Sequence, residues 1–432
     1  MEKKLLFPRK TVPKITGYLD TPEIILLIGA RQVGKTSILY LLMDELKRKK
    51  IPDSHIDYFD LEDLDTLQIF NRGAKEFIAY LGARGTDTKS KNYIFVDEIQ
   101  YMDNPANFLK IIADHYNNFK LIVSGSSTLE IKQKFKDSLA GRKVVFEIYP
   151  LDFYEYLIFK KEDALCNALL KSDIRHTDFK TDIDNIPARL LTKEFARHFN
   201  EYLIFGGYPR VALEPVHDKK LSYLIEIYNS YVKKDIKDLM RIDNITAFNN
   251  LLKALALQVG SLVNITELCN TVKIARETLE RYLFILENTF IIKTVSPFSS
   301  NPRKEISKMS KIYFIDTGLR NIIIKNMSAP NERVDAGALI ENSVLSQFLK
   351  NLLPLQEIHF WRTLAKNEVD FVLIEGNLIR PIEVKYTSFK SPKVPLGIRY
   401  FQRDYKTDKS IVLTKDYFGR ADNTIFLPWW LG

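Results

Sequence analysis

Hydrophobic positions in the first 150 residues form short continuous runs, with segments of helical spacing between them. Such runs are typical of a parallel α/β sheet, because each strand of that sheet is buried on both faces. Strands are expected at 24–28, 56–60, 93–96, 121–123 and 144–148. Helices are expected between them, for example at 37–48 and 107–116. We therefore expect residues 1–150 to form one α/β domain.

The chain after residue 150 follows other patterns. Residues 151–247 have helical spacing and many charges, which indicates a helical lid or subdomain. Residues 248–330 are expected to contain two helices separated by a turn and then an apolar strand, the order found in a winged helix. Residues 331–432 begin with an expected helix at 337–353. Strands are expected to follow at 359–362, 369–374, 378–384 and 410–413, which indicates a second α/β domain.

A glycine-rich loop joins the first expected strand to the first long helix. It reads Gly29-Ala30-Arg31-Gln32-Val33-Gly34-Lys35-Thr36, with Ser37 next in the helix. The glycines allow backbone N–H groups to surround an anion, and the helix adds its positive end. In such a P-loop the lysine reaches the β- and γ-phosphates of a nucleotide and the threonine hydroxyl binds Mg²⁺. The loop is therefore expected to bind ATP with Mg²⁺.

Polar residues at other strand ends complete this candidate site. Asp97 and Glu98 follow the expected strand at 93–96, at the edge where α/β sheets bind ligands. We expect Asp97 to hold the Mg²⁺ and Glu98 to act as the base that orients water. Ser124 is our candidate for contact with the γ-phosphate or water if its strand lies between the other two, and an ordinary turn serine is the alternative. Arg142 could stabilise transition-state charge in its own subunit or a neighbouring one, or be a surface residue.

Residues of the C-terminal segment form a second candidate site. Asp370 lies in one expected strand, and after a short turn the next strand places Glu383 and Lys385 on one face. This pattern resembles the PD-(D/E)xK nuclease superfamily. The resemblance implies that Asp370 and Glu383 bind a second Mg²⁺, that Lys385 activates water and stabilises phosphate charge, and that Glu341 on the preceding helix supplies a further acid. The alternatives are a hairpin with surface charges and a relic fold that does not cleave.

The charge balance favours an anionic partner. The chain of 432 residues has a formal net charge of +9 and a pI near 9.1, so nucleic acid, DNA first, is the leading candidate. An ordinary basic protein is the alternative. Two glutamates on the second helix of the expected winged helix, Glu277 and Glu280, oppose contact with phosphates. The basic residues that could contact phosphates lie on this helix or after the following strand: Arg276, Arg281, Arg303, Lys304, Lys308 and Lys311.

Cysteine content and hydropathy bear on the compartment. Cys166 and Cys269 are the chain's 2 cysteines and lie far apart, so neither a disulfide framework nor a cysteine-rich metal site is expected. Apolar stretches stay short of the roughly 20 residues that span a bilayer. The N-terminus lacks the apolar segment of a signal peptide. We expect a soluble, cytoplasmic protein that does not bind a membrane.

The order of the motifs resembles that of prokaryotic, often archaeal, AAA+ ATPases that carry a C-terminal domain of unknown function. Besides the P-loop, the resemblance rests on Val96-Asp97-Glu98-Ile99-Gln100, Ser124-Gly125-Ser126-Ser127, Gly141-Arg142, Tyr149-Pro150-Leu151 and Gly206-Gly207-Tyr208-Pro209. It implies an AAA+ fold that uses ATP and Mg²⁺, and it makes Arg142 a candidate arginine finger.

The C-terminal pattern resembles the PD-(D/E)xK nuclease superfamily. Asp370, Glu383 and Lys385 match its motif, Glu341 fits the acid that a preceding helix often supplies, and Val369 stands where the motif name has proline. The resemblance implies a restriction-endonuclease-like α/β fold for residues 331–432.

The sequence motifs are compatible with three functions. The first is an ATPase whose nucleotide state controls a winged-helix and nuclease-like module that acts on nucleic acid. The second is an ATP-regulated DNA nuclease. The third is a nucleotide-dependent assembly switch that binds a protein partner and cleaves nothing. Many AAA+ proteins form rings, but the motifs do not determine the oligomeric state.

Overall fold

The computed structural model describes residues 6–126, 139–172, 186–232, 236, 242, 244–299, 309–407 and 409–432. The chain divides into two compact units. The N-terminal unit consists of Met1–Tyr149 with Ser230–Ile242 and Asn288–Phe290. The C-terminal unit consists of Pro150–Asn229, Asp243–Glu287 and Ile291–Gly432. The three domains expected after residue 150 therefore lie mostly within one compact unit.

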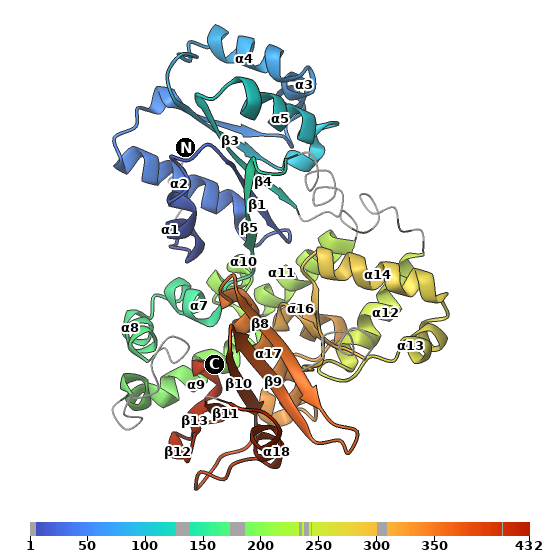
Figure 1. The fold of residues 1–432 in the computed structure, drawn as a ribbon. Helices are drawn as coiled ribbons and strands as arrows, with labels where there is room; N and C mark the ends of the chain where they lie inside the picture. Colours follow the sequence, from blue (N-terminus) through green and yellow to red (C-terminus); the bar gives the residue numbers. More distant parts are fainter. Residues whose placement is uncertain are drawn as a thin grey trace. The chain divides into compact units, whose positions relative to one another are not determined.

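The N-terminal unit contains a five-stranded parallel sheet with the strand order β2-β3-β4-β1-β5 (Figure 1). All five strands expected from the hydrophobic runs are present, each within three residues of its expected ends. They are β1 (Ile24–Gly29), β2 (Ile56–Asp60), β3 (Asn92–Asp97), β4 (Phe119–Ser126) and β5 (Lys143–Ile148). The accompanying helices are α1 (Thr11–Thr16), α2 (Lys35–Arg48), α3 (Leu64–Asn71), α4 (Ala74–Ala83) and α5 (Pro105–His115).

Burial explains why these runs become central strands. Every residue of β1, β3 and β4 is buried, as the continuous apolar runs require. The helix α2 buries Ile38, Leu39, Leu42 and Leu46, which recur at helical spacing on one face. Because all the strands are parallel, the residues that follow β1, β3 and β4 meet at one edge of the sheet.

Helices dominate the first part of the C-terminal unit, as expected (Figure 1). They are α7 (Phe153–Phe159), α8 (Asp163–Lys171), α9 (Thr192–Phe205), α10 (Pro209–Leu213) and α11 (His217–Ser230). Three more helices and two antiparallel strands follow: α12 (Ile245–Leu257), α13 (Ile265–Val272), α14 (Arg276–Asn288), β6 (Ile292–Val295) and β7 (Lys311–Phe314). The helix–turn–helix–strand order expected for residues 266–295 is thus present.

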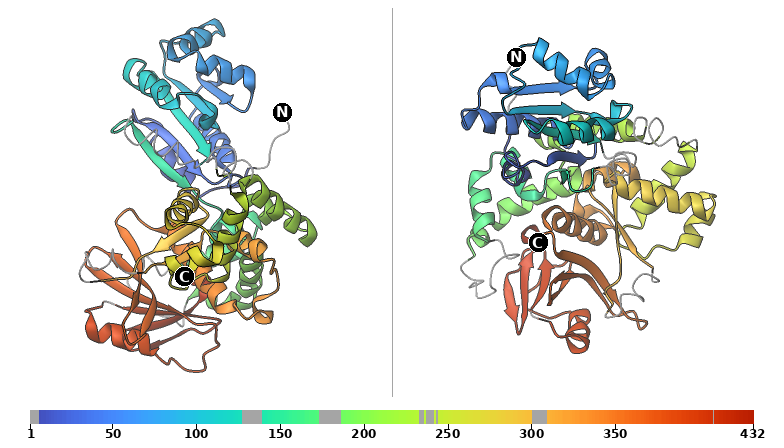
Figure 2. Two further views of the ribbon diagram at one scale, coloured as in Figure 1. Left: turned by 90° about the vertical axis from the view of Figure 1, so that its right-hand side faces the viewer. Right: turned by 45° about the horizontal axis from the view of Figure 1, so that its top comes forward.

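A six-stranded mixed sheet forms the last part of the C-terminal unit, and two further views show it in orange to dark red (Figure 2). Its strand order is β12-β13-β11-β10-β9-β8, in which β11 runs parallel to β10 and β13. The strands are β8 (Gln356–Arg362), β9 (Glu368–Glu375), β10 (Leu378–Val384), β11 (Ser410–Thr414), β12 (Gly419–Ala421) and β13 (Thr424–Pro428). The helix α17 (Ala336–Asn351) contacts β7 and β10, and α18 (Leu396–Asp404) contacts β9 and β10. The sequence analysis missed α18, β12 and β13.

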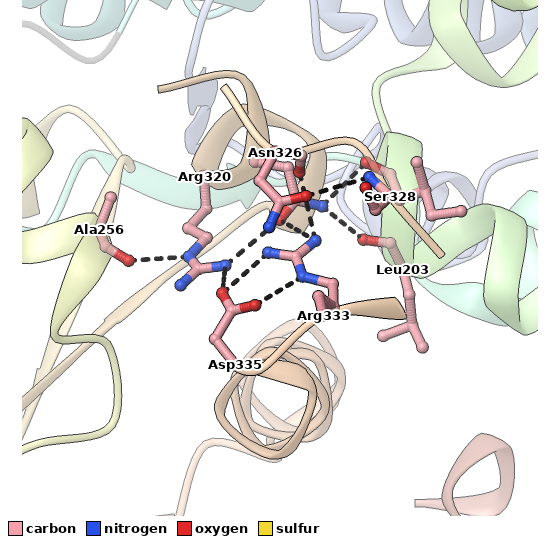
Figure 3. A network of polar contacts seen from close by, with 9 residues as sticks. Leu203, Ala256, Arg320, Asn326, Ser328, Arg333 and Asp335 are labelled. Carbon is pink, nitrogen blue, oxygen red and sulfur yellow. Dashed lines mark hydrogen bonds and ion pairs between the residues drawn. The ribbon is translucent and has the colours of Figure 1, made fainter. Parts of the chain in front are cut away.

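Buried polar contacts around α16 (Thr317–Ile324) hold the C-terminal unit together. Arg320 Nε donates to the carbonyl of Ala256 in α12, 2.8 Å away, and its guanidinium pairs with Asp335 just before α17 (Figure 3). Arg333 pairs with the same carboxylate, with Nε 2.7 Å from Oδ1. Asn321 donates to the carbonyl of Leu203 in α9, 2.9 Å away. These contacts explain why the segments before and after residue 330 form one unit.

Candidate functional site

The P-loop of the N-terminal unit has the backbone shape that its glycines predict. Gly34 has a φ of +95° and ends the loop directly before α2. A Cβ atom at Gly29 would lie 2.2 Å from the carbonyl oxygen of Ile148, so a larger residue is excluded there. Gln32 has a φ of +61°, a left-handed conformation that few residues adopt. The predicted strand, loop and helix follow one another without interruption.

Two basic residues stabilise this loop by donating hydrogen bonds to its carbonyl oxygens. The buried Lys35 ammonium donates to the carbonyl oxygens of Gly29 and Ala30, at 3.0 and 2.9 Å. Arg9 donates to the carbonyl of Val33 at 2.8 Å and to that of Tyr149 at 2.9 Å. The sequence analysis missed Arg9, because it lies in no motif and its partners are distant in sequence.

The buried Asp97 carboxylate is the centre of the site. Thr36 Oγ1 donates to Asp97 Oδ2 at 2.6 Å, and the Tyr58 hydroxyl donates to the same oxygen at 3.1 Å. Ser124 Oγ donates to Asp97 Oδ1. Burial, followed by the Asp97 charge, raises the pKa of Tyr58, so this hydroxyl stays protonated and acts as a donor. A hydroxyl and a carboxylate held together are the oxygen ligands that Mg²⁺ prefers, so this pair fits the expected ion.

The strand order brings Ser124 into the site. β4 lies between β1 and β3, which is the condition on which its expected role depended. Ser124 is fully buried, and its Oγ lies 3.4 Å from the backbone nitrogen of Glu98. Its hydroxyl thus contacts the Asp97–Glu98 strand end, and its expected contact with the γ-phosphate or water stays a prediction.

Glu98 leaves the strand in a left-handed conformation, with φ of +57° and ψ of +47°. Its N–H group donates to Asp97 Oδ1, 3.2 Å away. Left-handed backbone at a non-glycine residue costs about 1–3 kcal/mol and is concentrated at functional sites. Here it turns the chain at the edge of the sheet that carries the P-loop.

Arg142 does not lie with the P-loop, Asp97 and Ser124. It directly precedes β5, and the register pairs Lys143 with Ile24 at the first residue of β1, whereas the P-loop begins at the other end of β1. Its Nε donates to Asp114 Oδ1 at 2.5 Å. Six residues of strand span about 20 Å, so Arg142 cannot reach the P-loop of its own subunit. Of the alternatives left open for Arg142, action in its own subunit is excluded, because the parallel register puts Arg142 at the opposite end of the strands from the P-loop.

The acidic residues of the C-terminal unit do come together. The backbone nitrogen of Asp370 lies 3.3 Å from Glu383 Oε2, and Asp370 Oδ2 accepts from the N–H of Val384 at 2.8 Å. Lys385 Nζ pairs with Glu383 Oε1. The expected two-residue turn at Gly376-Asn377 joins β9 to β10 and creates this pairing. Glu341 projects from α17 into the same environment.

Lys311 and Tyr313 of β7 also contact this acidic cluster, which consists of Glu341, Glu368, Asp370 and Glu383. The sequence analysis did not predict these two contacts. Lys311 Nζ lies 3.3 Å from Glu341 Oε1 and 2.5 Å from Glu368 Oε1, and the Tyr313 hydroxyl donates to Glu341 Oε1 at 2.6 Å. Lys311 was expected among exposed phosphate contacts, but its side chain is only 2% exposed. That expectation is wrong because strand alternation turns Lys311 toward the carboxylates.

Burial controls the electrostatics of this cluster. Burial, and then the Asp370 charge, raises the pKa of Glu341 to about 7 and that of Glu383 to about 8. Burial also raises the pKa of Asp370. Burial opposes the charge of Lys311, but the Glu341 and Glu368 carboxylates outweigh it and raise the pKa of Lys311. The cluster therefore combines protonatable carboxylates with permanent internal cations.

In the C-terminal unit, metal binding would depend on the carboxylates of the acidic cluster. Among the residues that the structure describes, no three His, Cys, Asp or Glu side chains are grouped closely enough to hold a metal ion. Asp370 and Glu383 could offer oxygen ligands, and Mg²⁺ commonly completes its shell with water.

The helix α14 presents a charge pair on its surface. Arg276 Nε lies 2.7 Å from Glu280 Oε1, one helical turn away, so part of its charge is neutralised within the helix. Arg303, Lys304 and Lys308, which were expected as possible phosphate contacts, lie outside the described residues, as does Ser127.

Comparison with family models identifies the parts of the chain. Residues 21–157 match the model "AAA domain", residues 196–329 match "Domain of unknown function (DUF8612)", and residues 336–431 match "Domain of unknown function (DUF4143)". The chain carries an AAA-type P-loop domain. Its P-loop, Asp97 and Ser124 all lie within the matched range, and the acidic cluster draws Glu341, Asp370 and Glu383 from the DUF4143 domain but Lys311 from the preceding one.

Similar proteins cover nearly the whole chain. An "Uncharacterized protein" of Haemophilus influenzae is 23% identical over 100% of both chains, and "Uncharacterized protein MJ1637" of Methanocaldococcus jannaschii is 28% identical over 96% of this chain and 86% of its own. The occurrence of a relative in Haemophilus gives no support to an archaeal bias.

Two solved structures are similar to this chain at low sequence identity. The Walker-type ATPase PABY2304 of Pyrococcus abyssi has 17% identity and a TM-score of 0.42, with 74% of this chain and 96% of that chain covered. The ORC2 protein of Aeropyrum pernix, in ADPNP–ADP complexes, has 11% identity and a TM-score of 0.39, with 76% and 95% covered. Similarity this distant carries no argument about function. None of the helices described in the structure is both long and apolar enough to span a bilayer.

Proposed function

We propose that this protein is a Mg²⁺-dependent ATPase whose N-terminal unit carries the catalytic site. The observation that carries the proposal is the convergence of Thr36 and Ser124 on the two oxygens of Asp97, at the sheet edge where the P-loop begins. Backbone N–H groups of residues 29–37 would surround the phosphates, and Lys35 would move from loop carbonyls to the β- and γ-phosphates. Thr36 and Asp97 would hold Mg²⁺, which neutralises charge that develops on the phosphates.

Glu98 is the proposed base for the attacking water. It follows the metal-binding Asp97 directly, and its backbone is fixed by contacts to Asp97 and Ser124. The carboxylate would accept a proton from water as the water attacks the γ-phosphate. Ser124 would act indirectly, by orienting Asp97. Arg142 could serve only the nucleotide of a neighbouring subunit.

Phosphate release from ATP tests this proposal. The Lys35→Ala variant is expected to lose about 100-fold in kcat/KM, because it removes the charge that meets the phosphates. Lys47→Ala is the matched control, since Lys47 lies on the same helix and makes an exposed pair with Asp53. Removal of Mg²⁺ with a chelator should abolish turnover. Wild-type turnover by Lys35→Ala would refute the assignment.

A second function, Mg²⁺-dependent nucleic-acid cleavage, is favoured by the juxtaposition of Asp370, Glu383 and Lys385. Two carboxylates would bind the ion and the lysine would stabilise phosphate charge. Asp370→Ala should then abolish cleavage of DNA and leave ATP hydrolysis unchanged. Asp416→Ala is the control because Asp416 is exposed elsewhere in the same domain. If the wild type cleaves neither DNA nor RNA with Mg²⁺ or Mn²⁺, this second function is refuted.

We further propose that the nucleotide state controls how the helix-turn-helix segment and the DUF4143 domain present themselves to nucleic acid. The three helices and two strands at 245–314 support a winged helix, and the net charge of +9 favours an anionic partner. Limited proteolysis with ATP, ADP and no nucleotide tests this control, and identical patterns would count against it. ATPase assays with duplex DNA, single-stranded DNA and RNA separate a nucleic-acid-coupled enzyme from a switch that binds protein.

A further inference from the structure

Gln100 lies two residues after Glu98, on the short 3₁₀ helix Ile99–Tyr101, and bridges two parts of the ATPase site. Its Oε1 accepts a hydrogen bond from the backbone N–H of Ser126, 3.1 Å away at the end of β4. Its Nε2 donates to Glu98 Oε2. The side chain therefore links the carboxylate of Glu98 to the central strand β4.

The chemistry of the two partners fixes the orientation of the Gln100 amide. A backbone N–H group can only donate, so it must face the amide oxygen, and the amide nitrogen must then face the Glu98 carboxylate. The left-handed backbone of Glu98 starts the turn that brings Gln100 back toward its neighbour. Since the Gln100 bond engages Oε2, the second carboxylate oxygen of Glu98 keeps its capacity to accept from a water molecule.

We propose that Gln100 is a positioning residue for Glu98 during ATP hydrolysis, and this inference rests on the base role proposed for Glu98. A glutamate side chain that is free to rotate spends much of its time away from the reacting water. Anchoring one oxygen to β4 restricts the carboxylate, and small losses of such positioning lower catalytic rates strongly. Gln100 has no expected contact with nucleotide or Mg²⁺, so its removal should change kcat rather than ATP affinity.

The Gln100→Glu variant tests the bridge with almost no change in shape. One carboxylate oxygen can still accept from Ser126, while the other replaces the donor that faces Glu98 with a negative charge. We expect kcat to fall about tenfold or more and the ATP dissociation constant, measured by calorimetry, to stay within about twofold of the wild-type value. Gln100→Ala should also lower kcat without altering affinity. Gln68→Glu is the matched control, since it adds the same charge on the exposed face of α3 and should keep the wild-type kcat.

Glu98→Gln separates this inference from the proposed function. If Glu98→Gln keeps a measurable residual rate and the double variant Glu98→Gln/Gln100→Glu loses no further activity, the two residues act as a unit. If Glu98→Gln is inactive while both Gln100 variants hydrolyse ATP at the wild-type rate, the positioning role alone is refuted. A higher kcat in Gln100→Ala, or a loss of ATP affinity parallel to the loss of kcat, also overturns it. If Glu98→Gln keeps the wild-type rate, the base assignment fails and the positioning role fails with it.

Discussion

Single side chains in this protein owe their roles to partners far away in the sequence. Lys311 illustrates this at the acidic cluster, where its ammonium lies between the Glu341 and Glu368 carboxylates. A buried cation that loses its anions, or buried anions that lose their cation, leave charge uncompensated in a poorly solvated place. Lys311 is therefore expected to be more important for stability than any exposed lysine of the same sheet.

Replacement of Lys311 by methionine should lower the free energy of unfolding of the C-terminal unit by about 3 kcal/mol. Tryptophan fluorescence during urea unfolding measures this, because all 3 tryptophans, Trp361, Trp429 and Trp430, lie in that unit. Lys293→Met is the matched control on the adjacent strand, where the pair with Glu287 is partly exposed, and it should cost under about 1 kcal/mol. Equal effects of the two variants would contradict the stabilising role of Lys311.

At the scale of elements, a close approach between the backbone at the end of α9 and the side chain of Asp316 shapes the junction between helices. Gly206 ends α9 with a φ of +73° and a ψ of −164°, a region that essentially only glycine occupies. A Cβ atom there would lie 2.2 Å from Asp316 Oδ1. The Asp316 carboxylate is needed at that place because it accepts from the N–H groups of Gly207 at 2.7 Å and Leu319 at 2.9 Å. The first glycine of the Gly-Gly-Tyr-Pro motif thus has a structural explanation.

Gly206→Ala should destabilise the C-terminal unit by about 3 kcal/mol, from backbone strain together with the clash against Asp316. Gly376→Ala is the control in the same unit, since Gly376 also has a positive φ, of +57°, but has open space around the added atom. It should cost about 1 kcal/mol. Urea midpoints from tryptophan fluorescence compare the two variants, and a Gly206→Ala effect no larger than that of Gly376→Ala would rule out the clash.

On the scale of the whole molecule, ion pairs in the C-terminal unit set its resistance to acid. Burial opposes the charge of Glu201, but hydrogen bonds and charges from Lys220 and Lys160 outweigh burial and lower its pKa to about 2. Burial likewise opposes the charge of Asp335, yet Arg333 and Arg320 hold its pKa well below its usual range. In the unfolded chain both carboxylates titrate near their ordinary values, about 4. The unfolded state therefore binds more protons than the folded state between about pH 4 and pH 2.

The stabilisation that Glu201 contributes to the C-terminal unit through its ion pairs should be complete above about pH 4.5 and fall by about 2 kcal/mol as the pH approaches 2. Urea titrations at several pH values, followed by tryptophan fluorescence, measure this slope. Glu201→Gln should make the slope shallower, whereas Glu226→Gln, at an exposed pair with Arg210, should leave it unchanged. An unchanged slope in Glu201→Gln would show that this carboxylate does not drive acid unfolding.

The sequence by itself determined the strands of the N-terminal unit and the local chemistry of its P-loop. Short continuous apolar runs predict buried strands, and the glycine spacing before Lys35 predicts a phosphate-binding turn. Both patterns depend only on residues that are close together in the sequence. The hairpin that joins Asp370 to Glu383 was also predictable, since a two-residue turn fixes the register of its strands.

Tertiary structure alone decided which side chains meet across long separations. Strand order placed Ser124 beside Asp97, and register placed Arg142 at the opposite end of the strands from the P-loop. Tertiary packing also brought the buried Lys311 next to Glu341 and allowed Arg9 to donate a hydrogen bond to the carbonyl of Val33. The physical reason is that periodicity states which face of an element is buried, whereas the partner of a buried charge depends on how distant elements pack.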